Sequence, residues 1–354
     1  MTTVTHAPSP GPSAAAPAPR TPGLKRLLVF APNWLGDAVM ALPAIADVRR
    51  GRPDLTIDVA ARPAVAPLFG LVPGVGDVTV LPAGGLLAGA VPRELQDRSY
   101  DAALILPNSF QAALTAWRAG IPERWGYRTD CRGPLLTRGV ARPGRVHQAA
   151  YYQRLAHELG FASGPLEPRL EVPAVARRAA GDLLTAGGWD GRAPLVALAP
   201  GAAYGGAKRW PPESFAALAT ALAADGVSSV LVGSAADRLA GQEVAAALGA
   251  GVRAIDLVGR TDLPGLAGVL AHCRGLVSND SGAMHVGAAL GVSVTAMFGP
   301  TIERETRPLG RPDPVVLTHQ VWCRPCMLRE CPLDHRCMRG ISVEAVLAAA
   351  RRSL

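Results

Sequence analysis

The stretch VSNDSGAMHVGAAL, from Val277 to Leu290, begins with apolar residues, breaks at Asn279-Asp280-Ser281-Gly282, and resumes with small and apolar residues at helical spacing. This pattern predicts a buried strand, a short polar loop and a buried helix. Unpaired backbone N–H groups at the start of such a helix form an anion site. The alternative is that Asp280 or Ser281 only caps the helix. The stretch therefore predicts an α/β fold with a polar loop that either binds a ligand or only caps the helix.

The same alternation of short apolar runs and helical stretches continues through the chain. We expect strands over residues 25–31, 56–60, 77–81, 100–106, 194–199, 227–232, 275–278 and 292–298. We expect helices over residues 38–50, 109–119, 147–160, 174–188, 212–225, 237–248, 263–273, 281–290 and 342–354. Such alternation indicates βαβ units and parallel sheets.

The alternation occurs as two series, which predict two Rossmann-like doubly wound domains facing one another across a cleft. We expect a disordered tail over 1–23, domains over 24–185 and 186–340, and a last helix over 341–354. In this architecture ligands bind outside the carboxyl ends of the strands. The loops that follow strands are therefore where we look for chemistry.

The composition limits the classes of partner. The chain has 354 residues, enough for two domains, and a formal net charge of +8. That charge favours a phosphorylated substrate or an anionic membrane face, although a general preference for arginine explains it equally well. A basic run with interleaved aromatic residues is missing from the sequence, so we expect no nucleic-acid partner.

The sequence also bears on location. It has no window of about 18 apolar residues that would predict a membrane-spanning helix. Residues 1–23 are rich in Pro, Ala and Ser and lack the apolar stretch of a secretory signal. We therefore expect a cytoplasmic protein whose contact with a membrane is peripheral.

Two further loops carry candidate residues. In APNWLGDAVM, Asp37 stands where a helix begins, as a catalytic carboxylate or as an ordinary first-turn acid. The loop APGAAYGGAKRWP, residues 199–211, contains three glycines and then Lys208. It matches neither common phosphate-binding motif, but its small residues and its lysine suit a diphosphate. The alternative is a flexible loop in solvent.

The polar break after the strand at 275–278 has two kinds of group. The N–H groups of Ser281, Gly282 and Ala283 would face an anion, whereas Asp280 would repel a phosphate and accept hydrogen bonds from sugar hydroxyls instead. His285, one turn into the helix, either points at the same anion or packs. The later sequence FGPT, residues 298–301, predicts only a turn.

Four of the six cysteines, Cys323, Cys326, Cys331 and Cys337, lie within fifteen residues. In a cytoplasmic protein this clustering indicates a metal before disulfides, and four thiolates can hold a structural zinc ion. An iron–sulfur cluster or two disulfides remain alternatives. Four protein ligands leave no open coordination position, so we expect no catalytic role for this segment.

Taken together, the loops resemble the ADP-heptose:lipopolysaccharide heptosyltransferases, most closely their heptosyltransferase II branch. The matching segments, in order, are LLVFAPNWLGDAVMALPAI, LPNSFQAAL, GIPERWGYR, PGAAYGGAKRWP, VLVGSAADR and VSNDSGAMHVGAALGVSVTAMFGPT. They cover residues 25 to 310. The resemblance implies the GT-B fold and an inverting transfer that needs no metal or other cofactor for catalysis.

The resemblance implies that ADP-heptose binds the C-terminal domain. Lys208 matches the diphosphate-binding lysine of the family, and Asp237 falls near an acidic ribose contact. The other donor-binding positions that it implies are Gly201, Asp280, Ser281, Gly282 and His285. Where some relatives have hydroxyl residues upstream of the lysine, this chain has Ala203 and Tyr204, so contacts there would have to come from the backbone.

The resemblance also implies that the N-terminal domain binds the acceptor, a lipid A-linked inner-core oligosaccharide at the inner membrane. Asp37 matches the proposed general base of the family. The acceptor-binding positions in the matching segments are Asn108, Ser109 and Arg128.

Two rival functions remain open on the sequence. One is another sugar-nucleotide enzyme of the same architecture, such as an epimerase or a UDP-sugar transferase, which release of ADP rather than UDP would exclude. The other is a non-catalytic scaffold that binds glycolipid precursors. The presence of both Asp37 and Lys208 argues against a scaffold.

Overall fold

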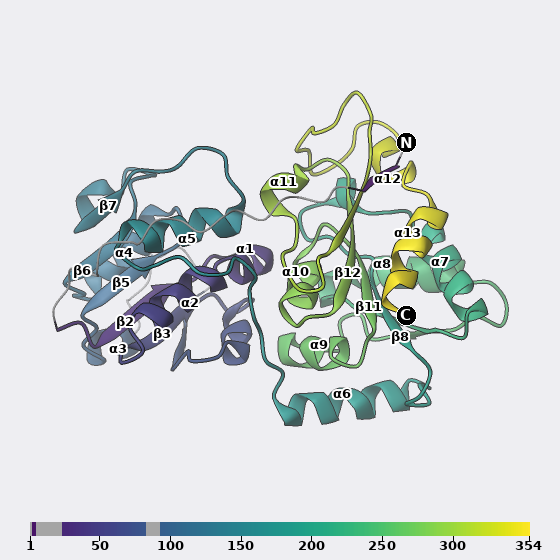
Figure 1. Cartoon of the computed structure of the whole chain (residues 1–354), viewed down its shortest axis with the longest axis horizontal. Coiled ribbons are helices and arrows are strands. Elements are labelled where there is room, and N and C mark those ends of the chain that lie inside the picture. The colour runs from purple at the N-terminus through teal and green to yellow at the C-terminus, as the bar shows by residue number, and fades with distance from the viewer. Residues whose placement is uncertain (1, 5–22, 83–92) are drawn as a thin grey trace. The chain divides into compact units, whose positions relative to one another are not determined.

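The computed structural model describes residues 2–4, 23–82 and 93–354. The described chain forms two compact units, one of residues 23–169 and the other of residues 170–354 together with the strand β1 (Thr2–Val4) (Figure 1). Each unit is built on its own sheet with helices on both faces.

The sheet of the first unit has six strands in the order β4-β3-β2-β5-β6-β7, and each neighbouring pair is parallel. Its strands are β2 (Arg26–Phe30), β3 (Thr56–Ala61), β4 (Val78–Val80), β5 (Ala102–Ile105), β6 (Glu123–Tyr127) and β7 (Arg138–Val140). Counted within the unit, this is the order 3-2-1-4-5-6 of a Rossmann sheet. The sense in which successive strands are added to the sheet reverses between β2 and β5.

The helices of this unit cover the sheet because the central strands are apolar on both sides. They are α1 (Leu35–Met40), α2 (Leu42–Gly51), α3 (Arg93–Asp97), α4 (Phe110–Arg118) and α5 (Gln148–Glu158), with the 3₁₀ helices η1 (Ala66–Leu71) and η2 (Gly133–Leu135). Phe30 and Ile105 of the sheet pack with Ala113 and Ala116 of α4 in one core cluster. Helices α2 and α5 pack against one another.

The second unit repeats this topology. Its sheet order is β1-β13-β12-β11-β8-β9-β10, in which β1 alone runs antiparallel to its neighbour. Its other strands are β8 (Leu195–Ala199), β9 (Ser228–Leu231), β10 (Ala254–Asp256), β11 (Gly275–Asn279), β12 (Ser293–Phe298) and β13 (Val315–His319). The sense in which successive strands are added to this sheet reverses between β8 and β11.

Helices α9 and α10 lie on one side of this sheet and α7, α8 and α13 on the other (Figure 1). The helices are α6 (Ala174–Ala186), α7 (Pro212–Ala224), α8 (Arg238–Ala247), α9 (Leu263–Leu270), α10 (Gly282–Ala289), α11 (Glu303–Thr306), α12 (Arg336–Arg339) and α13 (Val343–Ala350). The 3₁₀ helices are η3 (Gly206–Lys208), η4 (Ala235–Asp237) and η5 (Arg351–Ser353). Trp210, Phe215 and Met338 are central to a core cluster that α7 and α13 close.

Two boundaries differ from those that we expected. The units divide between Arg169 and Leu170 rather than near residue 185, because α6 packs against α9 of the second unit. Gly268 of α9 permits this contact, since a Cβ there would lie 2.5 Å from the carbonyl oxygen of Ala176. Thr2–Val4 form β1 on the edge of β13, where a strand partner orders a segment that composition alone marks as disordered. The rest of the expected tail, residues 1 and 5–22, lies outside the described residues.

The prediction of two doubly wound α/β units is confirmed. Within the described ranges, every helix falls short of the length and hydropathy needed to cross a lipid bilayer.

Candidate active site

Most of the expected site residues lie on the loops that follow the two strands between which the strand order of each sheet reverses. In the second unit, β8 leads into the loop with Gly201 and Lys208, and β11 leads into Asp280 and Ser281. Strands β8 and β11 are neighbours in parallel register, so their following loops emerge side by side. In open α/β sheets this is the place where ligands bind.

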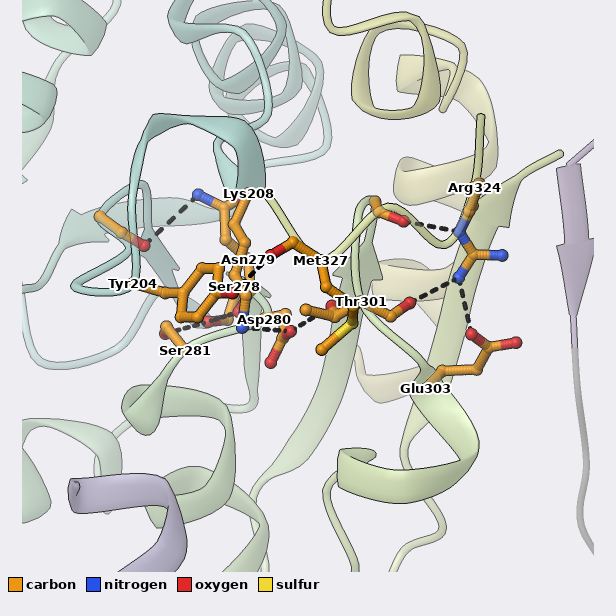
Figure 2. Close-up of polar contacts among 12 residues, drawn as sticks. Tyr204, Lys208, Ser278, Asn279, Asp280, Ser281, Thr301, Glu303, Arg324 and Met327 are labelled. Atoms are coloured by element: carbon orange, nitrogen blue, oxygen red, sulfur yellow. Dashed lines mark hydrogen bonds and ion pairs between the residues drawn. The ribbon is translucent and has the colours of Figure 1, made fainter. Parts of the chain in front are cut away.

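Lys208 and Asp280 meet at this edge (Figure 2). The Lys208 Nζ lies 2.6 Å from Asp280 Oδ2, and the two side chains are only 12% and 6% exposed. Thr301 donates its hydroxyl hydrogen to the same oxygen at 2.6 Å. Removing two charges from water is unfavourable unless each keeps a close partner. The pair therefore fixes a cation and a carboxylate together at the mouth of the sheet.

The start of α10 follows directly. Ser281 is its N-cap residue in an extended conformation, and in the described part of the chain its side chain makes no capping hydrogen bond. The Ser281 hydroxyl instead lies 3.1 Å from that of Ser278. The N–H groups that begin at Gly282 are thus not capped by Ser281, which leaves a helix start suited to an anion. His285 is buried within α10, at 4% exposure.

Asp237 is brought close to the lysine loop by β9. A Cβ at Gly201 would lie 2.1 Å from Asp237 Oδ1, so the carboxylate rests against this glycine. Asp237 Oδ2 accepts hydrogen bonds from the Ser234 backbone N–H at 2.9 Å and from its hydroxyl at 2.7 Å. The bond from the backbone N–H belongs to a capping box, in which the Ser234 side chain in turn accepts from the Asp237 backbone N–H, so one carboxylate oxygen is fixed structurally.

The Asn279 side chain joins the same two loops by hydrogen bonds. Its Oδ1 accepts from Trp210 N at 3.0 Å, and its Nδ2 donates to Pro200 O at 2.8 Å. The side chain is fully buried, and it joins the end of β11 to both ends of the lysine loop. The sequence pattern pointed to Asp280 and did not single out its neighbour.

In the first unit, Asp37 lies in α1, just after β2. The N-cap of α1 is Trp34, so Asp37 is a first-turn residue and not the cap itself. Its side chain is half-buried, and its charge reaches Tyr152 of α5. Burial, and then the nearby Asp37 carboxylate, hold the pKa of Tyr152 well above its usual range.

The expected acceptor residues have local partners. Asn108 follows β5 and contacts the Tyr151 hydroxyl, with its Nδ2 at 2.7 Å and its Oδ1 at 2.9 Å. Ser109 caps α4, accepting from Ala112 N at 3.4 Å. Arg128, after β6, donates from Nε to Gly139 O at 2.7 Å.

A fully buried arginine, which the sequence did not reveal, supports this region. Arg132 donates to Tyr127 O at 2.8 Å and to Pro107 O, and its guanidinium lies 3.5 Å from Asn108 Oδ1. Burial lowers the pKa of Arg132. Its bonds to two backbone carbonyls fix the loop that carries Asn108.

The four clustered cysteines line one small cavity of about 20 Å³, together with residues that include Ala207 and Pro300. All six cysteines of the chain are free thiols. Among the residues that the structure describes, no three His, Cys, Asp or Glu side chains are arranged as ligands of a metal ion. The isolated Cys273 is half-buried, and the desolvation of its thiol raises its pKa to about 12. The cysteines of the cluster therefore converge without being set in a finished coordination geometry.

A family comparison accounts for these loops. The family model of glycosyltransferase family 9 (heptosyltransferase) matches residues 89–336, more than half of the chain. The chain belongs to glycosyltransferase family 9.

Individual relatives of this family agree. The chain is 34% identical over 307 residues to lipopolysaccharide heptosyltransferase 2 of Escherichia coli K12, with 82% of this chain and 87% of that protein covered. Its structure is similar to that of the E. coli ADP-heptose lipopolysaccharide heptosyltransferase II, at a TM-score of 0.81 and 30% identity over 93% of this chain and 98% of that one. The E. coli heptosyltransferase WaaC solved with ADP has a TM-score of 0.70 at 18% identity, over 93% of this chain and all of that one, which is a likeness of fold.

These comparisons confirm the resemblance drawn from the loops, the GT-B fold class and the expectation of a glycosyltransferase of the heptosyltransferase family. The family therefore supplies the reaction class.

Proposed function

We propose that this family 9 enzyme transfers heptose from ADP-heptose to the inner core of lipopolysaccharide, with a lipid A-linked heptose as acceptor and inversion at the anomeric carbon. The single observation that supports it best is the Lys208–Asp280 pair beside the start of α10. That arrangement offers a cation, helix N–H groups and a carboxylate within one site, as a diphosphate-linked sugar requires. Relatives named for ADP-heptose and lipopolysaccharide support the same donor and acceptor.

On the donor side, the diphosphate takes Lys208 as its counterion. Asp280 then exchanges the lysine for sugar hydroxyls, which donate to its carboxylate while Thr301 keeps it in place. As the anomeric C–O bond breaks, negative charge develops on the departing ADP. Lys208 and the N–H groups at Gly282 stabilise that charge without a metal ion. Gly201, Asp237, Ser281 and His285 complete the donor-binding set.

On the acceptor side, Asp37 is the general base. It removes the proton from the acceptor hydroxyl as the hydroxyl oxygen forms its bond to the anomeric carbon. The electron pair of the broken C–O bond leaves with ADP, so attack opposite the leaving group inverts the configuration. Asn108, Ser109 and Arg128 bind the acceptor, with Arg128 suited to its phosphate groups.

The acceptor also determines where the protein works. A lipid A-linked oligosaccharide is held at a membrane surface, and the net charge of +8 favours attraction to anionic phosphates there. We accordingly infer a cytoplasmic enzyme that associates peripherally with the inner membrane and has no nucleic-acid partner.

The Cys-rich segment is a candidate for a structural metal. Four thiols, Cys323, Cys326, Cys331 and Cys337, line one cavity of about 20 Å³, and a space that admits one water molecule needs only about 10–15 Å³. Thiolates are the ligands that structural zinc prefers. These residues fit a single ion by number and chemistry, and the ion would tie the segment together without taking part in the transfer.

A product assay tests the proposed function. The protein is incubated with ADP-heptose and core acceptors truncated at successive sugars, and the glycolipid is weighed by mass spectrometry. We expect a gain of one heptose and release of ADP, with UDP-sugars inactive as a matched control for the nucleotide. Transfer from a UDP-sugar, or no turnover with any truncated acceptor, would contradict the proposal.

A further inference from the structure

The Cys-rich segment, residues 323–337, is joined by hydrogen bonds to the turn that leads into Lys208. Three bonds connect them: Tyr204 Oη to Met327 O at 2.7 Å, Gly206 N to Glu330 Oε1 at 3.0 Å, and Ala207 N to Arg329 O at 2.9 Å. Two of the three involve backbone N–H groups, so the segment determines the path of this turn.

The glycines of the turn face this segment. Gly205 has a φ of +153°, and a Cβ there would lie 2.3 Å from Arg329 O. A Cβ at Gly206 would lie 2.6 Å from Glu330 Oε2. Only glycine allows so close an approach of two backbones. Gly205 is therefore needed for docking of the Cys-rich segment, whereas Gly206 meets only the flexible end of the Glu330 side chain. The sequence pattern suggested that both glycines cradle the diphosphate.

Tyr204 connects the Cys-rich segment to Lys208 through two contacts. The Lys208 Nζ lies 4.6 Å from the centroid of the Tyr204 ring, within the range of a cation–π contact. The hydroxyl of the same ring is bound to Met327 O (Figure 2). The ring is thus held at one end by the segment and supports the ammonium group with its face.

Arg324 makes a second connection, to the loop after β12. Its side chain is only 5% exposed, and it donates from Nε to Gly299 O at 2.6 Å and pairs with Glu303 Oε2 at 2.6 Å. The guanidinium also lies 3.4 Å from Thr301 O. Thr301 in turn donates to Asp280. A buried guanidinium with several partners fixes the backbone that it binds.

We infer that the Cys-rich segment is a working part of the donor site, and that Arg324 is a positioning residue for ADP-heptose. The segment fixes the position of the Lys208 side chain through Tyr204, and Arg324 fixes the position of the Asp280 side chain through Thr301. The inference rests on the proposed roles of Lys208 and Asp280 in binding the donor. It requires no contact between Arg324 and the substrate, because a lysine and a carboxylate that are already held at the site need only exchange partners when the diphosphate arrives.

Calorimetry with ADP, which needs no acceptor and no turnover, tests the inference. We expect Arg324→Gln and Thr301→Val each to weaken ADP binding by about two- to thirtyfold, the range of residues that act through a network. Because both act on Asp280, the double variant should be weaker than the worse single variant by less than about twofold. Arg336→Gln is the matched control: it removes an arginine of the same segment whose hydrogen bonds go to Asp334.

In steady-state kinetics the same loss of affinity should appear as a higher KM for ADP-heptose, with kcat changed less. Melting temperatures identify effects that come from stability alone. Tyr204→Phe keeps the ring and removes only the bond to Met327, so it tests the segment even if Arg324→Gln unfolds. For Tyr204→Phe we again expect ADP binding to weaken by at least about twofold.

Each outcome decides a different point. ADP affinity within twofold of the parent in both Arg324→Gln and Tyr204→Phe, while Lys208→Ala binds weakly, would overturn the positioning role alone. Equal losses in Arg324→Gln and Arg336→Gln would overturn it too, because the effect would then not depend on the contacts to the two loops. Unchanged ADP affinity in Lys208→Ala would show that the proposed donor site itself is wrong.

Discussion

Lys208 and Asp280 form an ion pair of 2.6 Å between loops that follow neighbouring strands, β8 and β11. Both side chains are nearly buried, so neither is a surface charge whose pairing has little effect. In the absence of donor, each satisfies the other. A bound diphosphate can replace the carboxylate as the partner of the lysine, which makes the pair a site prepared for an anion.

Lys208→Ala should therefore both weaken the binding of the donor and slow the reaction. A charge-assisted contact contributes about 1.5–3 kcal/mol, so kcat/KM for ADP-heptose should fall roughly ten- to hundredfold. The only other lysine of the chain is Lys25, whose backbone N–H binds Asp101 and whose side chain is exposed. Lys25→Ala is the matched control and should leave kcat/KM unchanged. Parent-like kinetics in a folded Lys208→Ala protein would remove the lysine from the site.

The same variant leaves Asp280 buried without its cation. Breaking a buried pair on one side commonly destabilises a protein by about 3–5 kcal/mol. Adding Asp280→Asn to Lys208→Ala should restore much of the melting temperature but none of the ADP affinity. If affinity returned together with stability, the loss in the single variant would reflect unfolding and not a missing contact.

The Cys-rich segment should hold about one zinc ion per chain when the protein is purified without added metal. Elemental analysis measures the zinc and iron, and thiol titration before and after chelation counts the accessible cysteines. Removing the ion should release up to four thiols and lower the melting temperature, because metal binding to such a site stabilises the fold. Less than a tenth of an equivalent of any metal, together with unreactive cysteines, would point to disulfides.

The packing of α6 on α9 leads to a prediction about stability. At Gly268 a Cβ would lie 2.5 Å from Ala176 O and 2.9 Å from the Cβ of Ala180, so Gly268→Val has to push the helices apart. Overpacking of this kind costs about 1–3 kcal/mol of the free energy of unfolding. Gly249→Val, at a site with nothing within 4 Å, is the control. Equal denaturation midpoints for the two variants would mean that α6 does not pack on α9 as described.

The sequence predicted the parts of the fold that have a clear period. Buried strands such as β8 and β11 are continuous apolar runs, and the helices between them show helical spacing, so both were found. Strand β6 was missed because it begins with Glu123 and Arg124 and is half-exposed there. Strand β13 was missed although its first four residues are buried, since Pro312 and Pro314 precede it and suggest a loop.

The site was predictable only where a motif carried it. Asp280 and Lys208 were found as separate loop residues, but their pairing depends on β8 and β11 being neighbours, which no local pattern encodes. Thr301 was taken for part of a turn, because its bond to Asp280 spans 21 positions. Arg324 had no signal at all, since it stands between Cys323 and Pro325 in a segment that its cysteines mark as a metal site, and its partners lie on the loop after β12.

Asp37→Asn should keep the fold and the affinity for ADP-heptose but lose most of the turnover. The substitution is nearly isosteric, and what disappears is the ability to take a proton from the acceptor hydroxyl. General bases contribute about 10²–10⁴-fold, so the loss should fall in kcat. Trp34, not Asp37, is the N-cap of α1, so the contribution of Asp37 to the helix start is that of a first-turn charge, worth about 0.3–1 kcal/mol.

The control for that variant is Asp54→Asn, which changes an exposed acid of the same unit, paired with Arg52, and should leave kcat unaltered. Measuring kcat, ADP-heptose affinity and melting temperature on both proteins separates catalysis from stability. The kcat of the parent should itself fall as acid protonates the base, and the residual rate of Asp37→Asn should lose that pH dependence. Turnover of Asp37→Asn within about threefold of the parent would be far below the range for a general base, and the base would have to be another residue.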